Sequence, residues 1–105
     1  MFFILFAAIP FSPTKPLATK ISPHAITVEW QRSGGPRVAS YKLFYRKKGN
    51  ADWIVVNIRG RMSYTAKELK PYETYKFRVF ALNNLGSSKS SAVAEYTTSE
   101  KGICH

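Results

Sequence analysis

Apolar and polar residues alternate in short runs along nearly the whole of this chain. Successive side chains of a β-strand point to opposite faces, so a period of two is typical of strands with one buried face. Residues 75–82 show it best, because Tyr, Phe, Val and Ala alternate there with Lys, Arg, Phe and Leu. Glycine-containing turns at 33–36 and 48–50 end two earlier runs. The pattern predicts seven strands, at 17–21, 26–30, 41–46, 53–58, 64–66, 75–82 and 92–97.

Seven short strands separated by turns favour a sandwich, in which two sheets pack face to face. The chain has 105 residues, which is the size of a single domain with one core. Hydrophobic residues make up 45% of it, too many for a disordered chain. We therefore expect an all-β fold, a seven-stranded immunoglobulin-like β-sandwich.

The expected domain spans residues 13–99, and the segments on either side differ from it in composition. Residues 1–12 are expected to be an apolar leader or a disordered segment. Their apolar stretch is far shorter than the ~20 residues of a membrane span, so no span is expected in this chain. It has neither the basic start nor the cleavage site of a typical signal peptide, and a signal peptide and a fragment edge both stay open. Residues 100–105 are expected to be a disordered tail, in which Cys104 is a free thiol or pairs with another chain.

Three segments carry residues in a specific order and spacing. Residues 26–30 read Ile-Thr-Val-Glu-Trp, and residues 41–45 read Tyr-Lys-Leu-Phe-Tyr. Residues 69–86 hold Leu-x-Pro, then a tyrosine, Val-x-Ala-x-Asn and a glycine. Together they resemble the fibronectin type III family, over residues 13–99. Members of that family fold without a disulfide, which agrees with the single cysteine of this chain.

The resemblance implies roles for several residues. Trp30 is implied to fill the space between the sheets, and Tyr75 to form a tyrosine corner, in which the buried ring's hydroxyl bonds a nearby backbone group. Gly86 is implied to take a positive φ. The implied structural core comprises Trp30, Tyr41, Leu69, Tyr75 and Val79.

The resemblance also implies a function. Members of this family serve as non-catalytic protein-binding or spacer modules in cell-adhesion and guidance receptors, outside the cell or at its surface. Muscle and cytoskeletal proteins contain such modules too, so an intracellular interaction module is an alternative.

No arrangement of residues in the sequence predicts a catalytic site or a metal site. Of the two histidines, His24 falls at a predicted turn and His105 at the terminus, and the six carboxylates are scattered. A nucleophile needs a base that a third group holds in place, and a metal site needs three or four clustered ligands. We expect no enzymatic activity, no cofactor and no metal.

The outer face of the third and sixth strands is the first candidate for partner binding. If Tyr41, Tyr45 and Val79 point inward, alternation directs their neighbours outward. These strands are adjacent in the family's fold, and Trp53 should project onto the same face. The candidate residues are Lys42, Phe44, Arg46, Trp53, Lys76, Arg78 and Phe80. Two interpretations stay open: the arginines stack on Trp53 as an internal support, or the phenylalanines form a patch that binds a protein.

The charge suggests a second candidate. Sixteen Lys and Arg against six Asp and Glu give a formal net charge of +10, which should attract polyanions. The candidate polyanion-binding residues are Lys47, Lys48, Arg59, Arg61, Lys67 and Lys70. They form a site for a sulfated glycan or acidic lipid, or a solvated rim that serves solubility alone. Nucleic acid is not expected as a partner, because no nucleic-acid-binding motif is present. The chain is expected to be a monomer, and its protein partner is not identified by the sequence.

Overall fold

The computed structural model describes residues 8–100, and these residues form eight strands and two sheets. The strands are β1 (Leu17–Ile21), β2 (Ile26–Glu29), β3 (Ser40–Lys47), β4 (Ile54–Ile58), β5 (Ser63–Ala66), β6 (Thr74–Asn83), β7 (Gly86–Ser87) and β8 (Ala94–Thr97). The expectations for the first seven residues and for the tail that contains Cys104 and His105 lie outside the described residues.

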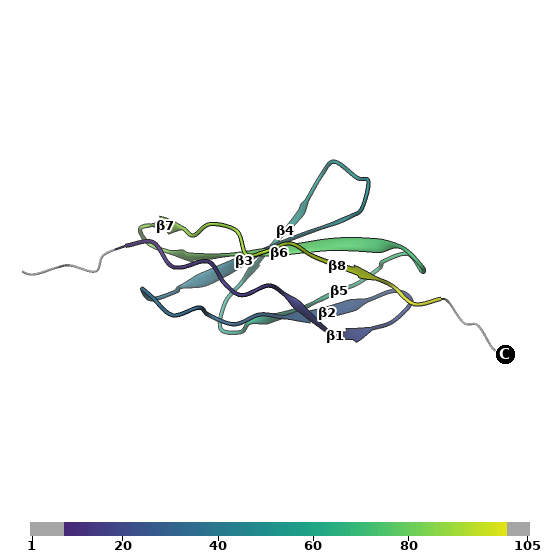
Figure 1. Cartoon of the computed structure of the whole chain (residues 1–105), viewed down its shortest axis with the longest axis horizontal. Helices are drawn as coiled ribbons and strands as arrows, with labels where there is room; N and C mark the ends of the chain where they lie inside the picture. The colour runs from purple at the N-terminus through teal and green to yellow at the C-terminus, as the bar shows by residue number, and fades with distance from the viewer. Residues whose placement is uncertain (1–7, 101–105) are drawn as a thin grey trace, which may run out of the picture.

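The two sheets pack face to face, which confirms the all-β sandwich (Figure 1). One sheet has the order β1-β2-β5. The other has the order β4-β3-β6-β7, and β8 also pairs with β6. Every strand pair is antiparallel, so alternate residues of each strand face the space between the sheets. The two ends of the described chain lie at opposite ends of the long axis (Figure 1).

The structure has one strand more than the sequence predicts. β7 (Gly86–Ser87) lies between the sixth and seventh predicted strands, where the sequence predicts none, and it pairs with the end of β6. The last strand begins at Ala94 rather than at residue 92. Between β7 and β8, two buried serines continue the pairing with β6. Val79 N donates to Ser91 Oγ (2.9 Å), and Ala81 N donates to Ser88 Oγ (2.9 Å). At these two positions a serine hydroxyl accepts the hydrogen bond that a backbone carbonyl oxygen would accept in a regular strand pair.

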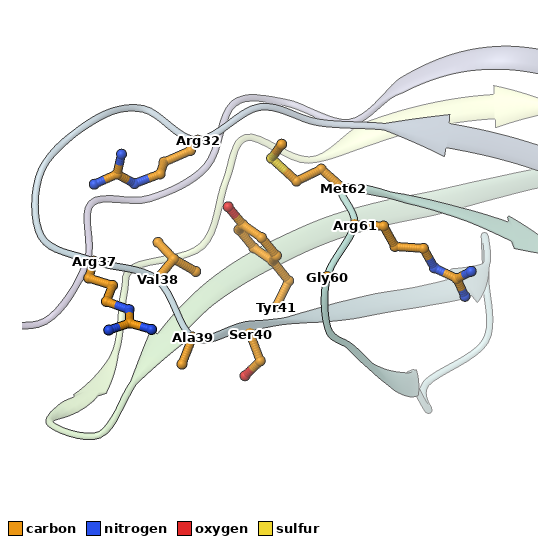
Figure 2. A pocket seen from close by; sticks show the side chains of 9 residues that line it. All are labelled: Arg32, Arg37, Val38, Ala39, Ser40, Tyr41, Gly60, Arg61 and Met62. Carbon is orange, nitrogen blue, oxygen red and sulfur yellow. The ribbon is translucent and has the colours of Figure 1, made fainter.

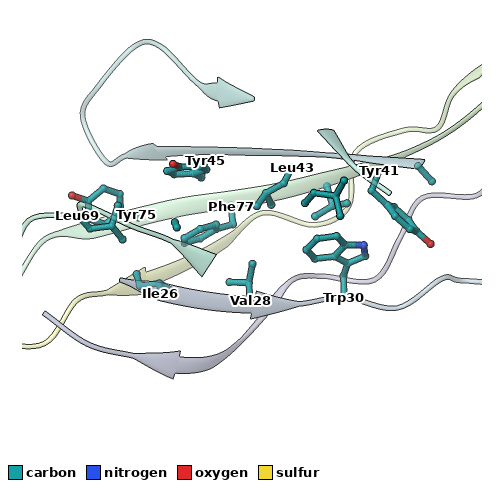
Figure 3. Packing of buried hydrophobic residues seen from close by; sticks show 13 residues of the cluster. Ile26, Val28, Trp30, Tyr41, Leu43, Tyr45, Leu69, Tyr75 and Phe77 are labelled. Atoms are coloured by element: carbon teal, nitrogen blue, oxygen red, sulfur yellow. The ribbon is translucent and has the colours of Figure 1, made fainter. Parts of the chain in front are cut away.

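The core between the sheets is the one expected from the alternation (Figure 3). Trp30 lies at the end of β2, and its ring meets Tyr41 edge-on at 5.7 Å between ring centroids. Tyr75 closes the other end of the core, where its hydroxyl accepts a hydrogen bond from Lys70 N (2.9 Å), as a tyrosine corner requires. All the inward-facing residues expected on the third and sixth strands are buried: Tyr41, Leu43, Tyr45, Tyr75, Phe77 and Val79. Leu69 is buried beside them.

The fourth strand is unevenly buried along one face. Alternation puts Ile54, Val56 and Ile58 on the same face of β4, and Ile58 is buried, but Ile54 is 53% exposed. The hairpin that joins β3 to β4 rises away from the sandwich (Figure 1), and β4 is the edge of its sheet. No strand of the opposite sheet therefore covers the start of β4.

Candidate functional site

The seven residues of the candidate face lie together on the outer side of the five-stranded sheet. In the β3–β6 ladder, Phe44 is opposite Arg78, Lys42 opposite Phe80 and Arg46 opposite Lys76. Trp53 precedes β4 and reaches the same side. We call this set the outer face: Lys42, Phe44, Arg46, Trp53, Lys76, Arg78 and Phe80. All seven residues are half-buried, because they cover one another.

Aromatic rings and guanidinium groups are stacked across the outer face. Arg78 Cζ lies 4.6 Å from the centroid of Trp53, and 5.4 Å from the centroids of Phe44 and Phe80. Arg46 Cζ lies 4.7 Å from the Trp53 centroid. Phe44 and Phe80 meet edge-on at 5.1 Å. The stack of both arginines on Trp53, one of the two interpretations that the sequence left open, is therefore present.

The charge of the outer face is poorly compensated. Among residues 8–100, the structure forms ion pairs only at Glu95, which lies 3.8 Å from Lys76 Nζ and 3.6 Å from Lys48 Nζ. Arg46 donates to the carbonyl oxygen of Asn50, which carries no net charge. The Nε atoms of Arg46 and Arg78 are buried and lack a hydrogen-bond partner. Aromatic rings hold both cations, and no carboxylate within residues 8–100 forms an ion pair with either of them.

The structure adds one residue to this surface. Val55 is opposite Phe44 in the β3–β4 ladder, so it projects onto the outer face, and it is 46% exposed. The sequence held the signal for this placement, since Val55 is two residues after Trp53, which was expected on the outer face, and side chains two apart in a strand share a face. Val55 is a more exposed apolar residue than either phenylalanine of the stack.

The candidate polyanion residues are not gathered into one rim. Three of them, Lys47, Lys67 and Lys70, line a groove of about 590 Å³, which Asp52 and Glu68 also line. Of the others, Arg61 shares a second hollow with Lys67 and Glu68 and also lines a third, Lys48 pairs with Glu95, and Arg59 follows β4 on the exposed surface.

Two core tyrosines show shifted acidity. Burial raises the pKa of the Tyr45 hydroxyl, and Tyr64 and Glu68 add to this rise. Burial also raises the pKa of Tyr41, while the charge of Arg32 opposes the rise. Both hydroxyls therefore stay protonated well above neutral pH.

The described part of the chain contains no group of three His, Cys, Asp or Glu side chains placed to hold a metal ion. Within residues 8–100 there is also no helix long and apolar enough to cross a membrane.

Three curated proteins with a similar sequence indicate which larger proteins contain a segment of this kind. The chain is 30% identical over 96 residues to human "Cell adhesion molecule-related/down-regulated by oncogenes". The aligned segment covers 86% of this chain and 8% of that protein. It is 33% identical over 95 residues to Drosophila melanogaster "Tyrosine-protein phosphatase Lar" (89% of this chain, 5% of that protein). It is 40% identical over 72 residues to human neogenin (67% and 5%). The chain thus spans less than a tenth of each relative.

Solved structures agree with the sequence relatives. The fibronectin type-III domain of human "fibronectin type III domain containing protein 3" superposes with a TM-score of 0.78 at 29% identity, over 90% of this chain and 91% of that one. Domains A168–A170 of titin match with a TM-score of 0.75 at 26% identity, over 88% of this chain and 33% of that one. The family model for the fibronectin type III domain matches residues 11–97. The chain therefore belongs to the fibronectin type III domain family.

Proposed function

We propose that this chain is a non-catalytic protein-binding module and that its outer face, together with Val55, contacts the partner. The observation that carries the proposal is the uncompensated Arg78, which lies among three aromatic rings beside an exposed valine. Arginine and aromatic residues carry much of the binding energy at protein interfaces. A carboxylate of a partner would find two cations here that no acidic side chain of the described residues neutralises.

The stack also favours binding because it is already ordered. Long side chains usually lose conformational entropy when a partner fixes them, at about 0.5–1.5 kcal/mol each. Arg46 and Arg78 are held against Trp53 in the free domain, so most of this cost falls on folding rather than on binding.

We propose a location outside the cell, in a longer cell-surface receptor. The relative whose name describes it as cell adhesion molecule-related supports this location. The opposite placement of the two ends of the described chain suits a module joined in a row with others (Figure 1). The similarity to titin domains supports the alternative of an intracellular interaction module.

Binding to living cells tests the proposal. Fluorescent tetramers of the domain should stain a subset of a panel of cell lines, and Val55→Asp should lower the staining about tenfold by burying a charge in the contact. Ile21→Asp is the matched control, because Ile21 is a β-branched residue, 43% exposed, on the edge strand of the other sheet. Brief trypsin treatment of the cells should abolish staining, while heparan sulfate lyase should leave it.

Three outcomes would contradict the proposal. Equal losses for Val55→Asp and Ile21→Asp would remove the outer face from the contact. Loss of staining after the lyase alone would make the ligand a glycan. No staining of any cell line would leave the domain as a spacer.

A second candidate function is binding of a sulfated glycan in the groove lined by Lys47, Lys67 and Lys70, and the convergence of these lysines favours it. The triple substitution to alanine should then elute from a heparin column at lower salt than the wild type. The fall in the eluting salt concentration should be larger on the heparin column than on a sulfonate exchanger, because the exchanger reports charge alone. The matched control replaces three exposed lysines elsewhere, Lys15, Lys20 and Lys89. Equal shifts for the two triple variants on both columns would reject the glycan site.

A further inference from the structure

A second surface of the domain lies at the end of the sandwich where β2 leads into β3 and β4 leads into β5. There the β2–β3 connection and residues 60–62 enclose a hollow of about 490 Å³ (Figure 2). We propose that this hollow binds an acidic peptide segment of a protein partner, which inserts one apolar side chain between flanking carboxylates. This site goes beyond the outer face and does not depend on it. We call it the arginine pocket, lined by Arg32, Arg37, Val38, Ala39, Ser40, Tyr41, Gly60, Arg61 and Met62.

The floor of the arginine pocket is apolar and firmly held. Figure 2 shows Tyr41, Val38 and Met62 at its centre. Tyr41 is only 7% exposed, and its ring packs edge-on against the buried Trp30. Met62 is 37% exposed, and its carbonyl oxygen accepts a hydrogen bond from Trp30 N (3.1 Å), which fixes the backbone beneath it. An inserted apolar side chain would thus meet an ordered surface.

The rim of the arginine pocket is cationic. Figure 2 shows the guanidinium groups of Arg32, Arg37 and Arg61 on different sides of the apolar centre. No lining residue is acidic, and none of the three arginines has a carboxylate within 4.0 Å in the described part of the chain. Arg32 donates to the backbone carbonyls of Gly35 and Pro36, which leaves its charge uncompensated.

This combination selects the class of ligand. Protein interfaces usually have an apolar centre surrounded by a polar rim. The planar guanidinium group of arginine forms two parallel hydrogen bonds with a carboxylate. A sulfated glycan would use the arginines but would gain little from Val38 and Met62. The space beside Gly60 is open to a peptide backbone, because a Cβ atom added at this glycine would meet no other atom within 4 Å. The observations therefore favour an acidic peptide over a glycan.

Four synthetic peptides test the inference. In each peptide, one apolar residue (Leu, Ile, Met or Phe) is flanked on each side by two glutamates. At least one should bind the labelled domain saturably, and the amide resonances that shift should cluster at residues 37–41 and 60–62. Replacing the central residue by serine should abolish saturation without altering the charge. The variant Arg37→Gln/Arg61→Gln should bind about tenfold more weakly, as expected for lost charge-assisted hydrogen bonds.

The controls separate the site from general attraction to a basic protein. Lys15→Gln/Lys20→Gln removes the same charge from an exposed region and should bind the peptide as the wild type does. A heparin-derived tetrasaccharide should shift these amides less than the peptide does. The inference is overturned if no peptide saturates, if the serine peptide binds equally well, if both double variants weaken binding alike, or if the tetrasaccharide binds this site more tightly.

Discussion

At the scale of single residues, Arg78 is the most informative side chain, because one guanidinium lies against three rings. A cation over an aromatic face contributes about 0.5–1 kcal/mol where it is exposed. Arg78→Met keeps an aliphatic side chain on the face but removes the charge. We expect the free energy of unfolding, measured by urea denaturation, to fall by about 1 kcal/mol.

Lys89→Met is the control for Arg78→Met, because Lys89 is exposed and forms no ion pair among the described residues. It should change the free energy of unfolding little. Equal losses in the two variants would mean that the stack contributes nothing to stability and that its order has another cause.

At the scale of elements, the pairing of β6 with the segment before β8 depends on serine hydroxyls. Ser91 is buried, and its Oγ accepts the hydrogen bond of Val79 N in the middle of β6. Ser91→Ala would leave that N–H buried without this acceptor, at a cost of about 1–3 kcal/mol. We expect urea denaturation to show this loss and hydrogen exchange to be faster at the Val79 amide.

Ser87→Ala provides the comparison for this element, since Ser87 is exposed and its hydroxyl bonds only locally, to the Ser88 carbonyl. Its effect on stability should be small. Unchanged exchange at Val79 in Ser91→Ala would show that another group accepts this hydrogen bond.

At the scale of the whole molecule, the packing of the two sheets couples stability to alkaline pH. Burial raises the pKa of Tyr45 above its ordinary value of 10.0. Above pH 10 the unfolded chain therefore releases this proton more readily than the folded chain, so stability present below pH 10 is lost as the pH rises. Tyr45→Phe should make this fall in unfolding free energy shallower, and denaturation from pH 9 to 11 measures it. Tyr72→Phe, at an exposed tyrosine, is the control for removing a tyrosine hydroxyl from the surface.

Much of the fold could be predicted because a strand has a period of two. Once Tyr75, Phe77 and Val79 were assigned inward, Lys76, Arg78 and Phe80 had to face outward. Family resemblance then indicated which strands are neighbours, and so the outer face was predicted with its stack. The binding roles of these residues remain predictions.

Features that depend on the ends of elements could not be predicted. Ile54 follows the inward pattern but lies where no opposite strand covers it. β7 forms because the end of β6 needs a partner, and its two residues carry no strand pattern of their own.

The sequence by itself determined the class of fold, the inner and outer side chains, and the excess of positive charge. Only the tertiary structure decided how that charge is distributed. It arranged the candidate polyanion residues around several hollows and brought Arg61 to the same hollow as Arg32 and Arg37, which are distant from it in the chain. The reason is that alternation is a local property of the backbone, whereas the position of a loop side chain depends on where the two sheets end and the chain crosses between them.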